Sequence, residues 1–411
     1  MPASKSISNR LLVIDALSGY GGEIRNLAVC DDTEAMACAL RQYRGSGSRY
    51  ALTVDVGAAG TAMRFLTAFF ASQDGSDVIV DGSRRMRERP IGELVGVLVG
   101  LGARIDYALP PGSGSSCGCP PLHICGCRLS SGGREIGIRG DISSQYISAL
   151  MMIAPYVGGG LTLVSPTGFT SRPYIGMTAS LMRRFGAEVE TGGNFVKVAE
   201  GKYGKVDITV ESDWSAASYW YEIKALVPDM EVRLKGLAED SLQGDSSIAG
   251  IFRNFGVTTR FVGDTAVLGY DKSLVAGSLE LDLSGCPDLA QTIVVTACLS
   301  GIRFRISGLH TLRIKETDRF WALQAELRKL GYRLHPAPGD RDALQWDGAK
   351  CDAADCPRIA TYKDHRMAMS FAPAALLFPG LVIEDAGVVS KSYPGFWDGI
   401  RQAGFRLEEA V

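Results

Sequence analysis

The stretch from Arg313 to Arg319 places three cations and two carboxylates within seven residues. It leads directly into an apolar helical pattern that begins at Phe320. A helix start favours anions through its unpaired N–H groups and its dipole. Lys315 and Arg319, one turn apart, therefore predict a site for phosphate or carboxylate groups, and Glu316 beside them could exchange protons. One such cluster alone is usually a solvated, ion-paired helix start, but similar clusters recur along this chain.

Polar side chains gather at the predicted starts of other helices in both halves of the sequence. Lys5, Ser6 and Arg10 accompany an apolar helix, and the small residues of 57–62 could let an anionic ligand approach the backbone. No Gly-Lys-Ser/Thr follows that loop, so an ordinary P-loop NTPase is disfavoured. Asp288 could cap the apolar helix that follows it or act as a general base. The motifs at 141–145 and 171–174 could also be plain helix caps. The other candidates are Arg64, Arg89, Ser143, Ser144, Gln145, Ser171, Tyr174, Arg366 and Lys391.

This inventory indicates a small ligand. The surplus of lysine and arginine suits two or more anionic groups, and the serines with Gln145 suit a polyol. The chain has 411 residues, 46% of them hydrophobic, and a net charge of −2. We therefore expect two or three domains and no binding of nucleic acid or of a membrane surface. Residues 367–383 are apolar but contain two prolines, which predicts a buried helix and strand.

The ten cysteines occur without a secretory signal, which predicts reduced thiols in a soluble, cytoplasmic protein. Cys117, Cys119, Cys125 and Cys127 form two C-x-C pairs with His123 between them. Thiolates this close could bind zinc, but the spacing differs from that of usual structural zinc sites. The pattern favours a surface hairpin with free thiols, and we predict no metal.

A unit of helix, glycine and strand repeats through the chain. The glycines are Gly102, Gly186, Gly256, Gly331 and Gly404, and each suits the left-handed position that ends a helix. The spacing is too long for a solenoid. It predicts two similar α/β domains that meet near residues 211–213, with the polar clusters collected in a cleft between them.

The motifs resemble those of the 5-enolpyruvylshikimate-3-phosphate (EPSP) synthase family of enolpyruvyl transferases. Nine motifs occur in the family's order, and the resemblance extends from Ser4 to about Trp397. They are KSISNR, GAAGTAMR, RMRERPIG, DISSQ, SRPY, SLQGD, RIKETDR, TYKDHRMAM and SKSYP. The resemblance implies an α/β (α+β) fold of two domains, each built from three βαβαββ units with pseudo-threefold symmetry, and an active site in the interdomain cleft. Residues 1–211 would mainly bind shikimate 3-phosphate. Residues 212–411 would carry the catalytic carboxylates and part of the phosphoenolpyruvate site.

The implied reaction joins shikimate 3-phosphate to phosphoenolpyruvate through a tetrahedral intermediate and releases phosphate, with no cofactor. Asp288 would take the proton of the 5-hydroxyl, Glu316 would move the proton at C3, and Lys5 and Lys391 would assist. The residues implied to bind shikimate 3-phosphate are Lys5, Ser6, Arg10, Ser143, Ser144, Gln145, Ser171, Tyr174, Asp288, Thr311 and Lys315. Those implied to bind phosphoenolpyruvate, and the inhibitor glyphosate in its place, are Lys5, Gly60, Arg89, Gln145, Arg319, Arg366 and Lys391.

Three departures from the family pattern carry expectations of their own. The family has a strand before its lysine-serine motif, whereas this chain has only four residues before Lys5, so one sheet is expected to be short. Phe65 stands where the family usually has proline, and Thr311 where it usually has asparagine. The alternatives are the sister enzyme that acts on UDP-N-acetylglucosamine, which uses a loop cysteine, and an inactive scaffold. The protein is expected to be a monomer.

Overall fold

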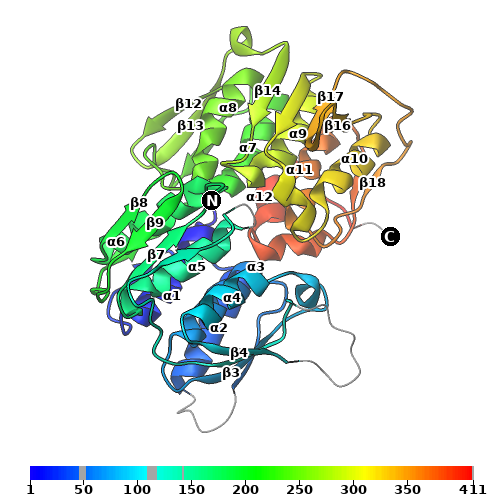
Figure 1. The fold of residues 1–411 in the computed structure, drawn as a ribbon. Coiled ribbons are helices and arrows are strands. Elements are labelled where there is room, and N and C mark those ends of the chain that lie inside the picture. The colour runs from blue at the N-terminus through cyan, green and yellow to red at the C-terminus, as the bar shows by residue number, and fades with distance from the viewer. Residues whose placement is uncertain (46–51, 109–117, 141–142, 410–411) are drawn as a thin grey trace. The chain divides into compact units, whose positions relative to one another are not determined.

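The computed structural model describes residues 1–45, 52–108, 118–140 and 143–409 (Figure 1). The chain divides into two compact units, Ser4–Val210 and Glu211–Val411, and the second also includes Met1–Ala3. Both units mix helices with small sheets, which confirms the α/β class. Within the described ranges, no helix is both long enough and apolar enough to cross a membrane.

The first unit contains the βαβαββ order twice. The first copy is β2 (Leu52–Asp55), α3 (Gly60–Ala71), β3 (Asp77–Asp81), α4 (Gly92–Gly100), β4 (Arg104–Tyr107) and β5 (Leu122–Cys125). The second is β6 (Glu135–Gly137), α5 (Ser144–Ile153), β7 (Leu161–Val164), α6 (Arg172–Arg184), β8 (Val189–Thr191) and β9 (Phe195–Val198). In each sheet the first two strands are parallel and the last strand lies antiparallel between the second and third. The unit is completed by α1 (Lys5–Leu17), α2 (Asp31–Gly45) and the parallel pair of β1 (Ile24–Arg25) and β10 (Ile208–Thr209).

The second unit contains the same order once in full. It runs through β14 (Ser278–Asp282), α9 (Ala290–Leu299), β15 (Arg303–Ser307), α10 (Arg319–Lys329), β16 (His335–Ala337) and β17 (Asp340–Trp346). A second set has α7 (Trp214–Leu226), β11 (Val232–Lys235), α8 (Ile248–Ile251), β12 (Val257–Val262) and β13 (Thr265–Tyr270) in a three-stranded sheet. This sheet has one strand fewer than the three four-stranded sheets, and Ala3 makes an isolated antiparallel bridge with Ser212.

The last set of the second unit is β18 (Arg358–Ile359), α11 (His365–Phe371), β19 (Val382–Ile383) and α12 (Phe396–Gln402), with β18 parallel to β19. Residues 367–383 thus form a buried helix followed by a strand, as predicted. The βαβαββ unit expected from the family resemblance is therefore complete three times within the described residues.

The leading helix of each set packs against the others of its own unit. In the first unit α1, α3 and α5 contact one another, and in the second α9 contacts both α7 and α11. Every residue of α9 is buried, and in α3 only Thr61 is partly exposed. A helix that is apolar all round needs such a central position. This packing brings the helix starts, where the polar motifs lie, close together within each unit.

The predicted helix-ending glycines are confirmed. Gly102 follows α4 with a φ of 109°, and Gly186 follows α6 with a φ of 89°. Residues with a Cβ rarely adopt this conformation. Gly256, Gly331 and Gly404 also have positive φ.

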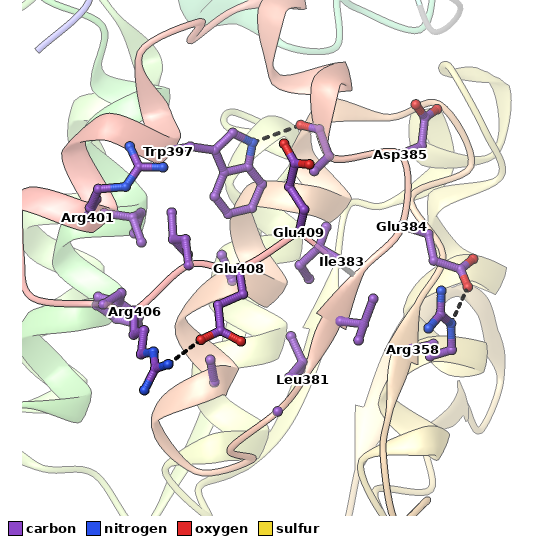
Figure 2. Close-up of a pocket in the computed structure, with 18 residues that line it drawn as sticks. Arg358, Leu381, Ile383, Glu384, Asp385, Trp397, Arg401, Arg406, Glu408 and Glu409 are labelled. Carbon is purple, nitrogen blue, oxygen red and sulfur yellow. Dashed lines mark hydrogen bonds and ion pairs between the residues drawn. The ribbon is translucent and has the colours of Figure 1, made fainter. Parts of the chain in front are cut away.

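The second unit also contains a pocket of about 1310 Å³ between β19, α12 and the segment 405–409 (Figure 2). Its apolar lining includes Leu381, Ile383 and Trp397, whose indole donates a hydrogen bond to the Ala386 carbonyl over 2.8 Å. Ion pairs such as Arg358–Glu384 at 3.1 Å also line it (Figure 2). None of the predicted substrate-binding residues lines this pocket.

Candidate active site

Arg319 is the centre of a charged cluster in the second unit. Its side chain is 2% exposed and contacts three carboxylates, those of Asp288 at 3.0 Å, Glu316 at 2.9 Å and Asp364 at 2.6 Å. Three helix starts supply these groups. Asp288 precedes α9, Glu316 precedes α10, and Asp364 caps α11 by accepting from the Arg366 backbone N–H. The two carboxylates predicted to be catalytic therefore meet at one guanidinium.

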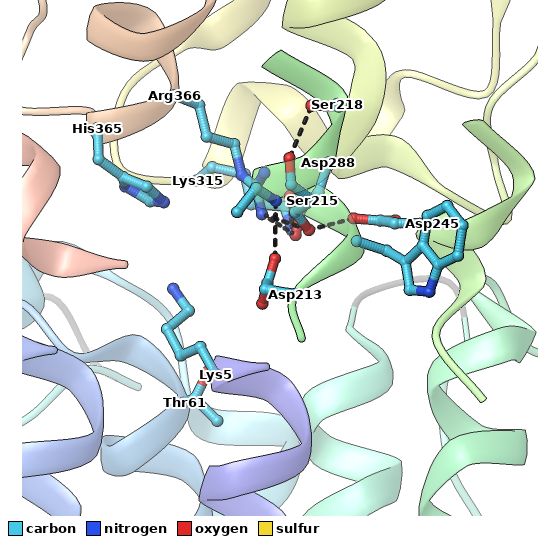
Figure 3. Close-up of polar contacts among 12 residues, drawn as sticks. Lys5, Thr61, Asp213, Ser215, Ser218, Asp245, Asp288, Lys315, His365 and Arg366 are labelled. Atoms are coloured by element: carbon cyan, nitrogen blue, oxygen red, sulfur yellow. Dashed lines mark hydrogen bonds and ion pairs between the residues drawn. The ribbon is translucent and has the colours of Figure 1, made fainter. Parts of the chain in front are cut away.

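Three further cations contact the same carboxylates, and Figure 3 shows two of them, Lys315 and Arg366, beside Asp288. The Lys315 Nζ lies 3.5 Å from Asp288, and Arg366 Nη2 lies 3.0 Å from the other oxygen of Asp288. The Lys391 Nζ contacts Glu316 at 3.0 Å. Burial alone would raise the pKa of Asp288, but the charges of Arg366, Lys315 and Arg319 outweigh burial and hold the pKa well below its ordinary value. Asp288 is thus an ionised acceptor set among cations.

Asp245 adds a buried carboxyl group that the sequence analysis did not single out. It is 3% exposed, and its Oδ2 accepts a hydrogen bond from the Ser215 hydroxyl. Ser215 Oγ in turn lies 3.4 Å from Arg366 Nη2. Burial first, and then the negative charge of Asp288, raise the pKa of Asp245 to about 7. The only signal in the sequence was the acidic end of the SLQGD motif.

Arg10 is the corresponding buried cation of the first unit. It is 3% exposed, and burial lowers its pKa to about 10. Its Nε donates to Thr178 Oγ1 over 2.7 Å, and its two terminal nitrogens donate to the Ser6 carbonyl at 2.8 Å and to Ser148 Oγ at 3.1 Å. Among the described residues, no carboxylate forms an ion pair with it. A cation buried among neutral groups favours an anionic ligand.

Two aromatic rings accompany Arg10. Its Cζ lies 5.4 Å from the centre of the Phe65 ring and 5.9 Å from that of Tyr174. Phe65 is fully buried in α3. This position, where the family usually has proline, therefore supplies a cation–π contact to the predicted substrate arginine.

The start of α3 meets Arg89 at very short range. A Cβ added to Gly60 would lie 2.5 Å from Arg89 Nη1. Arg89 is 8% exposed, and its buried Nε has no hydrogen-bond partner among the described residues. Gln145 joins the start of α5 to that of α3 by donating to Thr61 Oγ1 over 3.1 Å. Lys5 pairs with the buried Asp32 at 3.2 Å.

The other predicted ligand-binding residues have local roles. Ser143 caps α5 by accepting from the Gln145 backbone N–H over 3.2 Å, and Ser144 begins that helix. The preceding residues 141–142 of this motif, like Cys117, lie outside the described residues. Ser171 precedes α6 in a left-handed conformation with a φ of 51°. Thr311 is 7% exposed, and its hydroxyl has no partner among the described residues.

Solved structures show which fold class this is. An EPSP synthase from Acinetobacter baumannii matches with a TM-score of 0.74 over 100% of this chain and 96% of that one, at 22% identity. The enolpyruvyl transferase NikO from Streptomyces tendae matches with a TM-score of 0.70 over 98% and 93%, at 16% identity. At these identities the likeness establishes the fold, which is that of the enolpyruvyl transferases.

The sequence comparisons give the family. The model of EPSP synthase (3-phosphoshikimate 1-carboxyvinyltransferase) matches residues 1–400. A 3-phosphoshikimate 1-carboxyvinyltransferase from Bacteroides fragilis is 47% identical over 99% of this chain and 95% of its own length. One from Methanospirillum hungatei is 33% identical over 98% and 94%. The chain belongs to the EPSP synthase family. This confirms the predicted family and enzyme class, and it does not favour the nucleotide-sugar transferase or the inactive scaffold.

Proposed function

We propose that this protein transfers the carboxyvinyl group of phosphoenolpyruvate to the 5-hydroxyl of shikimate 3-phosphate and releases phosphate, as a transferase of the shikimate pathway. One observation carries the proposal for the chemistry: Asp288 and Glu316 share Arg319 and are each held by further cations. Such an arrangement combines groups that exchange protons with groups that stabilise a dianionic phosphate.

The addition step needs a base for the hydroxyl group and an acid for carbon. Asp288, kept ionised by three cations, takes the proton from the 5-hydroxyl as its oxygen bonds to C2 of phosphoenolpyruvate. C3 receives a proton from the pair of Glu316 and Lys391, which are 3.0 Å apart. The product of this step is a tetrahedral intermediate that keeps both phosphates.

The elimination step reverses the proton transfer at carbon. Glu316 takes one proton from C3, the C2–C3 double bond forms again, and the bond from C2 to the phosphate oxygen breaks. The phosphate that leaves is stabilised by five cationic side chains, those of Lys5, Arg89, Arg319, Arg366 and Lys391. The Asp288 proton is returned to solvent or to the released phosphate.

The proposed substrate roles divide between the two units. Shikimate 3-phosphate is bound mainly by residues of the first unit, which are Lys5, Ser6, Arg10, Ser143, Ser144, Gln145, Ser171 and Tyr174. The second unit contributes Asp288, Thr311 and Lys315. Phosphoenolpyruvate is bound by Gly60, Gln145 and the same five cations that stabilise the leaving phosphate, namely Lys5, Arg89, Arg319, Arg366 and Lys391. Arg10, buried without a carboxylate among the described residues, supports an anionic acceptor. We further infer that glyphosate competes with phosphoenolpyruvate.

We also propose a cytoplasmic location and a monomeric state. The nine cysteines in the described ranges are all free thiols, which agrees with a reducing compartment. Light scattering on the purified protein measures the mass in solution, and a dimer would contradict the second proposal.

The test of the function is a phosphate-release assay with each acceptor in turn. Shikimate 3-phosphate should support turnover and UDP-N-acetylglucosamine should not. Asp288→Ala and Glu316→Gln should each lower kcat by at least about a hundredfold, the usual contribution of a positioned acid or base. Glu280→Gln is the matched control, because Glu280 forms an exposed ion pair with Arg305 in the same unit. A folded Asp288→Ala or Glu316→Gln protein with normal turnover removes that residue from the mechanism.

A further inference from the structure

Three side chains of the kinds that bind transition metals converge on the sheet of β2, β3, β5 and β4. His123 Nε2 lies 2.7 Å from Asp77 Oδ1, and Cys125 Sγ lies 3.9 Å from the same nitrogen. All three potential ligand atoms lie within 4.8 Å of one another. None of the three residues belongs to the predicted substrate site.

The strand pairing explains why these side chains meet. In the antiparallel pair of β3 and β5, Asp77 is opposite Cys125 and Ile79 is opposite His123. Residues two apart on a strand share a face, so His123 and Cys125 point the same way as Asp77. The intervening Val78 and Ile124 are buried on the other face. The three ligand atoms are therefore held on the solvent side of a paired region of the sheet.

We propose that Asp77, His123 and Cys125 bind one Zn²⁺ ion, with water in the fourth position. Zinc bonds of about 2.0–2.3 Å in tetrahedral geometry place neighbouring ligand atoms roughly 3.4–3.6 Å apart. The observed separations of 2.7 and 3.9 Å lie on either side of this range. The third separation, between the ligand atoms of Asp77 and Cys125, is at most 4.8 Å. Side-chain rotations that move the ligand atoms by roughly 1 Å would bring all three separations into this range.

The charges and softness of the ligands favour zinc over a hard cation. A Cys125 thiolate and the Asp77 carboxylate together neutralise a divalent ion, and an imidazole with a thiolate suits zinc rather than Mg²⁺ or Ca²⁺. On β4, Asp106 is paired with His123 and Arg104 with Cys125, and the opposite charges of these two neighbours cancel.

The site differs from a four-cysteine centre. Cys127 donates its thiol to the Gly102 carbonyl over 3.1 Å, and Cys119 is buried with 6% exposure. Only Cys125 of the described cysteines in this region shares a face with His123. The ion joins the beginning of β3 to the end of β5, so it stabilises the sheet.

The test uses the untagged full chain freed of metal by a chelator. Zn²⁺ should bind with a stoichiometry of one in competition with a chromogenic chelator and should raise the melting temperature. Co²⁺ in its place should give a thiolate-to-metal charge-transfer band. Asp77→Asn, His123→Asn and Cys125→Ser should each weaken zinc binding by at least about 100-fold, more than loss of an outer hydrogen bond to a ligand. Cys125→Ser should also abolish the cobalt band.

Cys127→Ser is the matched control, a neighbouring cysteine whose loss should leave zinc affinity and the cobalt band unchanged. Each ligand variant should have the melting temperature of the metal-free wild type and should no longer respond to zinc. Three results would overturn the proposal: no stoichiometric binding, binding that survives both His123→Asn and Cys125→Ser, or an equal loss in Cys127→Ser. If one variant fails to fold, the other two still decide the outcome.

Discussion

Asp245 gives the sharpest quantitative prediction, because its charge state affects stability. Burial and the charge of Asp288 raise its pKa to about 7, from an ordinary value of 3.8. The folded protein therefore keeps a proton on Asp245 over a pH range in which the unfolded chain has lost it. Ionisation of the unfolded chain then lowers the free energy of unfolding as pH rises from about 4 to about 7, after which the effect levels off.

The substitution that isolates this effect is Asp245→Asn, which resembles the protonated acid and cannot ionise. At about 1.36 kcal/mol per pKa unit, a difference of roughly three pKa units limits the effect to about 4 kcal/mol. At about pH 5 the unfolded chain is already largely ionised at this position, so part of this loss of wild-type stability has occurred by then. The free energy of unfolding of Asp245→Asn relative to wild type should therefore increase by about 2.5 kcal/mol between about pH 5 and about pH 8.

Urea unfolding followed by tryptophan fluorescence is the appropriate measurement. All five tryptophans lie in the second unit, so the signal reports the unit that contains Asp245. Asp229→Asn, at an exposed aspartate of the same unit, is the control for removal of one carboxylate. A stability difference between Asp245→Asn and wild type that stays constant over this pH range would refute the assignment of a proton to Asp245.

Two further predictions concern the cations. Arg319→Met leaves three carboxylates without their shared partner and should lower the free energy of unfolding by about 3–5 kcal/mol. Arg358→Met, which breaks the exposed pair with Glu384, should cost less than about 1 kcal/mol, and equal losses in urea unfolding would contradict this view of the cluster. Gly60→Ala places a methyl group 2.5 Å from Arg89 Nη1. It should raise the glyphosate inhibition constant at least about tenfold and the KM for phosphoenolpyruvate by less; equal inhibition constants would show that this glycine does not shape the site.

The motifs were sufficient to predict the family, the repeated βαβαββ unit and the cluster at Arg313 to Arg319. Local patterns carry this information, because a helix start and its glycine end are defined by a few neighbouring residues. The confirmed left-handed conformations of Gly102 and Gly186 are examples. The proposed substrate roles of the individual residues remain predictions.

The partners of these residues could not be predicted in the same way. Arg319 meets Asp364 across 45 positions of sequence, and Arg10 meets Thr178 across 168. Such pairs depend on which helix starts become neighbours in the folded unit, and no local periodicity encodes that. For the same reason the proposed zinc site was not predicted. The sequence analysis considered His123 and the four cysteines and predicted no metal, whereas the strand register adds Asp77 beside His123 and Cys125.

The burial of the Arg319 cluster suggests how it combines a rigid part with a reactive part. Arg319 and Asp364 are 2% and 0% exposed, whereas Asp288, Glu316 and Lys315 are 19%, 16% and 26% exposed. The second group is therefore more accessible to a ligand, and Arg319 offers a ligand only a small exposed area. A buried ion pair adds little to stability compared with apolar packing of the same volume, so the Arg319–Asp364 pair is better explained by positioning. It fixes the guanidinium so that the two more exposed carboxylates are oriented before any substrate binds, which is the condition under which electrostatic stabilisation is most effective.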